Sequence, residues 1–188
     1  SEGVRYEEPK LKMMGIEAVK SSTPAPCRTM IKDALKLMMR GTEDDVIEFI
    51  ENARKEFKSL PPEEIAFPRT ASNVQKYKSS SDIYVKGTPI HIRGALLFNY
   101  YLRKKKLTNK YSAIENGEKI KFLYLKKPNT IQENVLSFIQ DFPTEFGLSQ
   151  YIDYELQFEK SFVYPLKAIL DAIGWEVEKK VTLESFFS

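Results

Sequence analysis

Residues 91–106 read HIRGALLFNYYLRKKK and residues 117–127 read GEKIKFLYLKK; these two stretches decide the fold class. In the first, apolar residues recur every three or four positions from Ile92 to Leu102, which predicts a helix over 91–105 with cations at its end. In the second, apolar and basic residues alternate from Ile120 to Lys127 after an Asn-Gly turn signal, which predicts a strand. A helix followed by a strand indicates an α+β fold.

Most of the remaining chain has helical periodicity, so the fold is expected to be mostly helical. The further helices predicted are 24–40, 43–58, one near 131–139, and a long one over 151–173. Gly41 separates the first two, and Thr42 with Asp45 three positions later resembles a capping box. Pro165 should kink the long helix and Gly174 should end it.

Two segments lack helical periodicity. Residues 1–22 mix β-branched and polar residues around Gly15, which predicts strand, turn and strand. Residues 65–88 are irregular, and the serine run 79–81 together with Gly87 predicts loops there.

The charges are sorted along the chain, although the net charge is only +3. Residues 69–127 hold 14 Lys/Arg against three acidic residues, whereas residues 1–68 and 128–188 are both net acidic. Tyrosines are interleaved with these cations. A local excess of this size favours binding of a polyanion, with nucleic acid as the first candidate. The alternative is a basic face that only keeps the protein soluble.

The sequence predicts neither catalytic nor metal-binding residues. One cysteine, Cys27, and one histidine, His91, cannot assemble a zinc cluster, and no internal disulfide is possible. The acidic pair Asp44-Asp45 lies at a predicted helix start, where acids are favoured, and Glu63-Glu64 follows a proline pair in a loop. No glycine-rich phosphate loop or nucleophile elbow is present, which indicates a binding protein.

The expected location is the cytosol, with no membrane partner. No run approaches the ~20 apolar residues of a membrane-spanning helix. The first ten residues, SEGVRYEEPK, have neither the basic region nor the apolar stretch of a signal peptide.

Three blocks of sequence resemble, in the same order, segments of a known protein family. They are RYEEPKLKMMGIEAVKSSTP (5–24), HIRGALLFNYYLRKK with IENGEKIKFLYL (91–105 and 114–125), and YIDYELQFEKSFVYPLKAILDAIGW (151–175). The first resembles the end of the palm of family B DNA polymerases, and the others resemble their thumb, most closely in T-even-type phages. The resemblance implies a palm-derived β segment at 1–22 and a thumb domain at 23–181 with a basic α/β tip at about 65–127.

The resemblance also implies which residues contact DNA. In the palm block these are Lys10, Lys12, Glu17 and Lys20; in the thumb they are Arg69, Ser72, Asn73, Lys76, Tyr77, Lys86, His91, Arg93 and Gly94. The palm residues would lie near the primer terminus and the thumb residues along the duplex phosphates. A solvated surface without a ligand is the alternative for each of them.

The implied function is that of a DNA-binding thumb fragment of a DNA-directed DNA polymerase, a nucleotidyltransferase. The fragment would grip primer–template DNA through phosphates and the minor groove. The family's metal-binding aspartates lie upstream, so the chain alone is expected to be inactive and to need no cofactor, while the complete polymerase would use Mg²⁺. If the polymerase is naturally split, an N-terminal portion with palm, fingers and exonuclease is a partner, in the cytoplasm of an infected bacterial host.

The last seven residues, TLESFFS (182–188), form a separate candidate site. A helical turn would place Leu183, Phe186 and Phe187 on one side, ready for an apolar pocket. The tail resembles the peptide with which family B polymerases bind the sliding clamp, although the leading glutamine of the fullest motif is missing. The alternative is that the tail folds back onto the core of this chain.

Two rival functions remain at this stage. One is a non-catalytic nucleic-acid-binding replication accessory protein that is basic in its middle third. The other is a nuclease fragment, which is disfavoured because the sequence has no evident carboxylate cluster.

Overall fold

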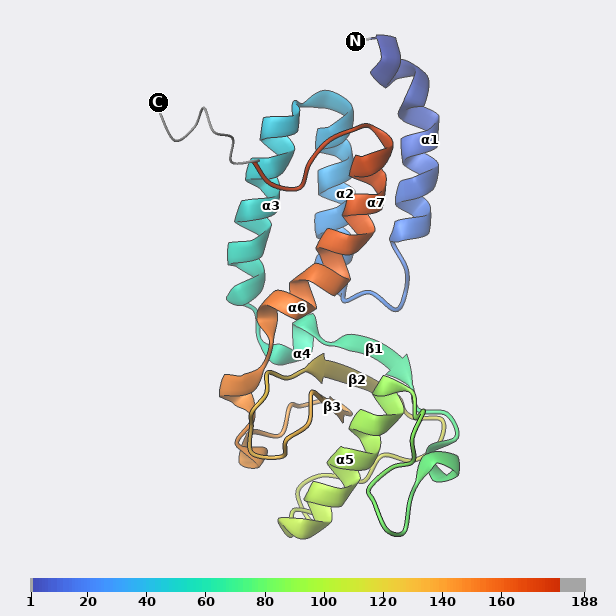
Figure 1. The fold of residues 1–188 in the computed structure, drawn as a ribbon, viewed down its shortest axis with the longest axis vertical. Coiled ribbons are helices and arrows are strands. Elements are labelled where there is room, and N and C mark those ends of the chain that lie inside the picture. Colours follow the sequence, from blue (N-terminus) through green and yellow to red (C-terminus); the bar gives the residue numbers. More distant parts are fainter. Residues whose placement is uncertain (1, 180–188) are drawn as a thin grey trace. The chain divides into compact units, whose positions relative to one another are not determined.

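The computed structural model describes residues 2–179, with side chains from residue 8, and divides them into two compact units (Figure 1). Unit 1 comprises residues 2–20, 26–59 and 158–179. Unit 2 comprises residues 21–25 and 60–157. The chain therefore leaves unit 1 after its first helices and returns to it near its end.

Unit 1 is helical. Its first three helices are α1 (Glu2–Ala18), α2 (Ala25–Arg40) and α3 (Glu43–Lys58), and the last two match the predicted helices within one residue. The predicted capping box is present at the start of α3. The Asp45 N–H donates to Thr42 Oγ1 at 3.2 Å and the Thr42 N–H donates to Asp45 Oδ2 at 2.9 Å.

The strand, turn and strand predicted for residues 1–22 are wrong, because this segment forms α1. Leu11, Met14, Gly15 and Ala18 follow the three-and-four spacing of a helix, and they are its less exposed positions. Leu11 is only 2% exposed, and α1 packs against the C-terminal helix of unit 1. Gly15 is no turn residue: it lies so close to Leu35 of α2 that an added Cβ would collide with the leucine side chain.

The long helix predicted over 151–173 is interrupted. The structure has a 3₁₀ turn (Ser149–Tyr151), α6 (Tyr154–Phe158), a π-helical turn (Glu159–Val163) and α7 (Tyr164–Ala172). The π-helical turn ends two residues before Pro165, which has no N–H for the regular helical ladder. Gly174 ends the helix as predicted, with φ of 74° and the Trp175 N–H donating to the Leu170 carbonyl at 3.0 Å.

Unit 2 is built around a three-stranded antiparallel sheet (Figure 1). Its elements are α4 (Pro62–Ile65), β1 (Phe67–Thr70), a 3₁₀ turn (Val74–Tyr77), α5 (Ile90–Lys104), β2 (Lys119–Tyr124), β3 (Val135–Phe138) and a 3₁₀ turn (Thr144–Phe146), followed by the 3₁₀ turn at Ser149–Tyr151 and all but the last residue of α6. The strand order is β1-β2-β3, with Phe67 opposite Phe122 and Leu123 opposite Leu136. Both α5 and β2 were predicted, so the α+β, mostly helical fold class is confirmed.

The helix predicted near 131–139 is wrong, because Val135–Phe138 forms strand β3. All four residues of this strand are buried, so both of its faces are covered and no alternation is visible in the sequence. A short apolar run of this kind has the same signal in a buried helix and in a buried strand. The pairing with β2 decides the outcome.

Helix α5 lies very close to β3, and Gly94 makes this approach possible. A Cβ added at Gly94 would lie 2.7 Å from the Ser137 backbone nitrogen and would also collide with the Ser137 hydroxyl. That hydroxyl donates to the His91 carbonyl at 2.8 Å. Gly94 is therefore a packing position between helix and strand.

Candidate nucleic-acid interface

The cationic segment 69–127 lies entirely within unit 2. Most of its lysines and arginines are exposed: Lys76, Lys78, Lys86, Arg103, Lys104, Lys105, Lys106, Lys110, Lys119, Lys126 and Lys127. Among the residues that the structure describes, only Lys110 of this exposed group forms an ion pair. The other exposed cations are available to an external anion.

Arg69 is held inside the unit, although the sequence predicts it as a DNA contact. Its Nη1 donates to the Ser22 and Pro68 carbonyls at 2.9 and 2.8 Å. Its guanidinium carbon lies 5.2 Å from the centre of the Phe122 ring, within cation–π distance. Burial lowers the pKa of Arg69. These contacts fix the side chain on the sheet and leave it little freedom to reach a phosphate.

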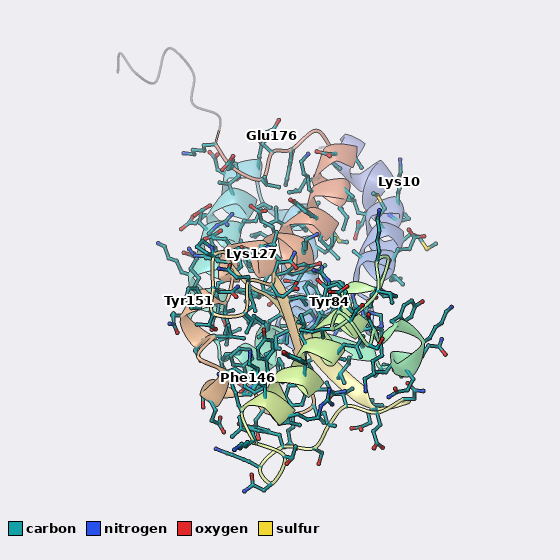
Figure 2. The ribbon with its side chains drawn as sticks, turned by 60° about the horizontal axis from the view of Figure 1, so that its bottom comes forward. Lys10, Tyr84, Lys127, Phe146, Tyr151 and Glu176 are labelled. Carbon is teal, nitrogen blue, oxygen red and sulfur yellow. The ribbon has the colours of Figure 1, made fainter. Side chains whose placement is uncertain are left out.

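Arg93 belongs to a second internal network, with Glu133 and Tyr84. The Tyr84 hydroxyl donates to Glu133 Oε1 at 2.8 Å, and Arg93 Nη1 lies 3.4 Å from Glu133 Oε2. The Arg93 guanidinium also lies 5.7 Å from the centre of the Tyr84 ring, whose place beside α5 is shown in Figure 2. Burial, followed by the hydrogen bond to Glu133, raises the pKa of Tyr84. Arg93 is thus largely neutralised within the unit.

Lys110 and Tyr111 share a third acidic partner, Glu145. Lys110 Nζ lies 2.8 Å from Glu145 Oε2, and the Tyr111 hydroxyl donates to Oε1 at 2.9 Å. The hydrogen bond from Lys110 is the largest of the effects that lower the pKa of Glu145 to about 2. Glu145 is therefore ionised at neutral pH and holds the loop after α5 to the turn at Thr144–Phe146.

The four residues predicted in the palm block are exposed on or just after α1, and Figure 2 shows Lys10 on that helix. Successive residues of a helix are rotated by about 100°, so Lys10 and Lys12 point to nearly opposite sides. A strand would have placed both lysines on one face. Lys12 Nζ also lies 3.6 Å from Glu8 Oε1, so the two side chains form an ion pair along the helix. Glu17 lies seven residues, or about two helical turns, after Lys10, so both are on the same face of α1. Lys20 lies just after the end of the helix.

The remaining predicted thumb residues divide by exposure. Ser72, Asn73, Lys76 and Lys86 are exposed and Tyr77 is half-buried, with Lys76 Nζ 5.4 Å from the Tyr77 ring centre. Two others face inward: Gly94 is buried, and His91 is half-buried with its pKa lowered by burial and then by Arg69.

The sequence leaves open whether the cations at the end of α5, Arg103 to Lys106, belong to the DNA-binding surface or remain in water, and the predicted site omits Lys78, Lys119, Lys126 and Lys127. All of them are exposed. The four consecutive cations after a helical apolar pattern were a visible signal. The others became evident only when the structure placed loops and strand ends on the same unit.

Three further observations concern metal ions, the membrane and the C-terminal tail. Among the side chains of residues 8–179, no three of His, Cys, Asp or Glu lie together in a way that would hold a metal ion. No helix in the same part of the chain is long and apolar enough to cross a membrane. Leu183, Phe186 and Phe187, predicted to bind a clamp, lie outside the described residues.

No protein-family model matches the chain, but comparison with known proteins finds phage DNA polymerases similar to it. The DNA-directed DNA polymerase of Enterobacteria phage T4 is 30% identical over 190 residues, and that of Escherichia phage RB69 is 33% identical over 191 residues. Each match covers 99% of this chain and 21% of the relative.

Over nearly its whole length, then, the chain is related to a segment of the phage DNA polymerases. The relatives are those of T4 and RB69, so the chain is similar to one segment of T4-like polymerases, as the resemblance in the sequence predicts. It spans about one fifth of the length of these relatives.

Proposed function

We propose that this chain is the palm-end and thumb portion of a phage family B DNA polymerase and that unit 2 holds primer–template DNA. The relationship to phage polymerases supports the enzyme class. The observation that carries the DNA-holding role is the charge of residues 69–127, whose exposed cations are mostly without acidic partners among the described residues. DNA is the polyanion that the name of these relatives, DNA-directed DNA polymerase, indicates.

Such a protein must hold product of any sequence. Contacts to phosphates and the minor groove meet this need, because base edges in the major groove carry the sequence information. Flexible lysines suit phosphate contacts, and the exposed cations of unit 2 are mostly lysines. The exposed residues of the predicted set, Lys76 and Lys86 above all, together with the cluster at the end of α5, are the proposed contacts. Arg69, Arg93 and Gly94 support the unit from inside.

Replacing Lys104, Lys105 and Lys106 together with alanine is expected to weaken binding of duplex DNA. Each lost phosphate contact reduces counterion release, so the affinity near 0.1 M salt should fall by about 10- to 100-fold. Fluorescence anisotropy with a labelled primer–template duplex measures this change. All three side chains are exposed, so the fold should be retained.

The matched control replaces Lys32, Lys36 and Lys55 with alanine. These lysines are also exposed but lie on α2 and α3 in unit 1, so the net charge changes equally. The control should lose less than about threefold. Equal losses in both triple variants would show that only net charge matters and would contradict a DNA-holding surface on unit 2.

Polymerisation itself is proposed to need the N-terminal portion of the enzyme. Palm aspartates that hold Mg²⁺ would come from that portion, so we expect this chain alone to be inactive. The working location would be the cytoplasm of an infected bacterial host. The partners are then primer–template DNA, the N-terminal portion if the enzyme is naturally split, and a sliding clamp bound by the tail.

Primer extension tests both protein partners together. Mixing the chain with a cognate N-terminal portion should restore extension, and a sliding clamp should lengthen the products.

Deleting residues 182–188 should abolish the clamp effect and leave duplex affinity unchanged, because Leu183, Phe186 and Phe187 would no longer fill an apolar pocket on the clamp. Clamp stimulation that survives the deletion would rule out the tail as the tether.

A further inference from the structure

Unit 2 contains a cleft of about 990 Å³, and two of the proposed duplex contacts, Lys86 and Arg103, lie on its walls. One wall is the loop from Lys78 to Lys86, and the other is the α5 face that carries Leu96, Tyr100 and Arg103. Ala113–Glu115 and Glu133 complete it. Clefts of roughly 300–1,000 Å³ accommodate small-molecule ligands, so this one has the scale of a few nucleotide units and is too small to enclose a double helix.

The walls of the cleft are held in place by contacts within unit 2. The Asn99 side chain accepts from the Ile114 N–H at 2.7 Å and donates to the Ile114 carbonyl at 3.0 Å, which fixes residues 113–115 against α5. The loop of the opposite wall is closed by a β-bridge between Lys78 and Tyr84. Because these contacts exist without a ligand, the cleft is largely pre-formed.

The lining combines a stacking surface with cations and hydroxyl groups. The Tyr100 side chain is 36% exposed and lines the cleft near Arg103. Lys78 and Lys86 stand on the opposite wall, with the serines 79–81 between them. Aromatic rings that stack on bases and cations that follow the phosphates are the usual components of sites for single-stranded nucleic acid.

The carboxylates of the cleft also favour unpaired bases. Glu133 is engaged by Arg93 and Tyr84, whereas Asp82 and Glu115 have no ion-pair partner among the described residues. Carboxylates accept hydrogen bonds from the amino groups of bases such as cytosine. Those groups are free on the Watson–Crick edge only when the base is unpaired. The near balance of acids and cations also makes this cleft less suited to a duplex backbone.

We propose that this cleft binds a short unpaired stretch of nucleic acid, with a base stacked on Tyr100 and the adjoining phosphates beside Arg103. The proposal rests on the proposed function, since it assigns a second nucleic-acid site to the unit that would hold the duplex. The cleft would capture a strand that has separated from its complement. Its ligand is a single strand held through Tyr100, whereas the duplex is proposed to bind through the exposed cations of the unit, two of which, Lys86 and Arg103, also line the cleft.

The test compares a labelled dC oligonucleotide with a labelled hairpin duplex in anisotropy titrations of the full chain. Tyr100→Ala should weaken binding of the single strand about fivefold or more and change duplex affinity less than twofold. Tyr100→Phe should bind the strand like the parent, because the ring is kept. Arg103→Ala should weaken strand binding more than Lys105→Ala, which removes the same charge from an exposed residue outside the cleft.

Each outcome has a defined meaning. Equal loss of single strand and duplex in Tyr100→Ala, or no loss of either, overturns the cleft site. A chain that binds duplex but no single strand also overturns it, while the proposed function stands. A chain that binds neither fails both proposals. Thermal melting of every variant shows whether the fold is retained, and Arg103→Ala tests the site even where Tyr100→Ala melts early.

Discussion

Replacing Gly94 with alanine is expected to lower the stability of unit 2 by about 1–3 kcal/mol. The new Cβ would lie 2.7 Å from the backbone nitrogen of Ser137, and backbone in a central packing position cannot move aside easily. Helix α5 would have to shift away from β3 along their whole contact. Hydrogen exchange of the backbone amides in α5 and β3 measures the change in opening free energy.

A double variant identifies the cause of this loss. Changing Ser137 to alanine in the Gly94→Ala background removes the clash with the hydroxyl but leaves the clash with the backbone nitrogen. Stability should therefore recover only in part, and the variant also loses the hydrogen bond from Ser137 to His91. Duplex affinity of the folded variant should stay within about twofold, because Gly94 is buried. If the stability of Gly94→Ala were unchanged and its duplex affinity reduced, Gly94 would have to be a DNA contact after all.

Replacing Phe158 with alanine is expected to lower the free energy of unfolding of unit 1 by about 3–5 kcal/mol. The side chain is 0% exposed. Its ring centre lies 5.2 Å from that of Phe57 and 5.0 Å from that of Phe162, and the Arg54 guanidinium lies 5.0 Å above it. Removal leaves a cavity that rigid neighbours from α3 and the π-helical turn cannot fill.

Urea denaturation followed by tryptophan fluorescence measures this loss. Trp175 is the only tryptophan of the chain and lies in unit 1, so its signal reports on that unit. Tyr164→Ala serves as the control, because Tyr164 is 53% exposed and should cost less than about 1 kcal/mol. A loss below about 1 kcal/mol for Phe158→Ala would mean that unit 1 has no tightly packed aromatic core.

Local patterns in the sequence predicted the elements that are stabilised locally. Helices α2, α3 and α5 each have one apolar face with a marked start or end, and the Thr42 capping box and the Gly174 stop are visible as residue types at fixed spacings. Strand β2 alternates because only one of its faces is covered along most of its length.

The elements that were predicted wrongly depend on distant partners. Strand β3 is buried on both faces, so its sequence has no alternation, and its pairing with β2 could not be inferred from local spacing. Residues 2–18 were assigned to strands because Gly15 looked like a turn, whereas it provides close contact with Leu35. In both cases tertiary contacts overrode the local signal.

The candidate site divides for a similar reason. Segregated charge in residues 69–127 was visible in the sequence and identified the basic unit. The sequence did not show which of these cations are free. Arg69, Arg93 and Lys110 are engaged by groups from other segments, such as Glu133 and Glu145. The cleft lined by Tyr100 also joins four separate segments and has no sequence signature.

The central claim is that unit 2 holds duplex DNA through its phosphates, and the salt dependence of binding tests it most directly. Anisotropy titrations of the full chain with a primer–template duplex give the association constant at several salt concentrations between about 50 and 200 mM. With roughly six to eight phosphate contacts, the slope of log K against log salt concentration should be about −5 to −7. A slope shallower than about −2, or no binding at the lowest salt concentration, would contradict the claim.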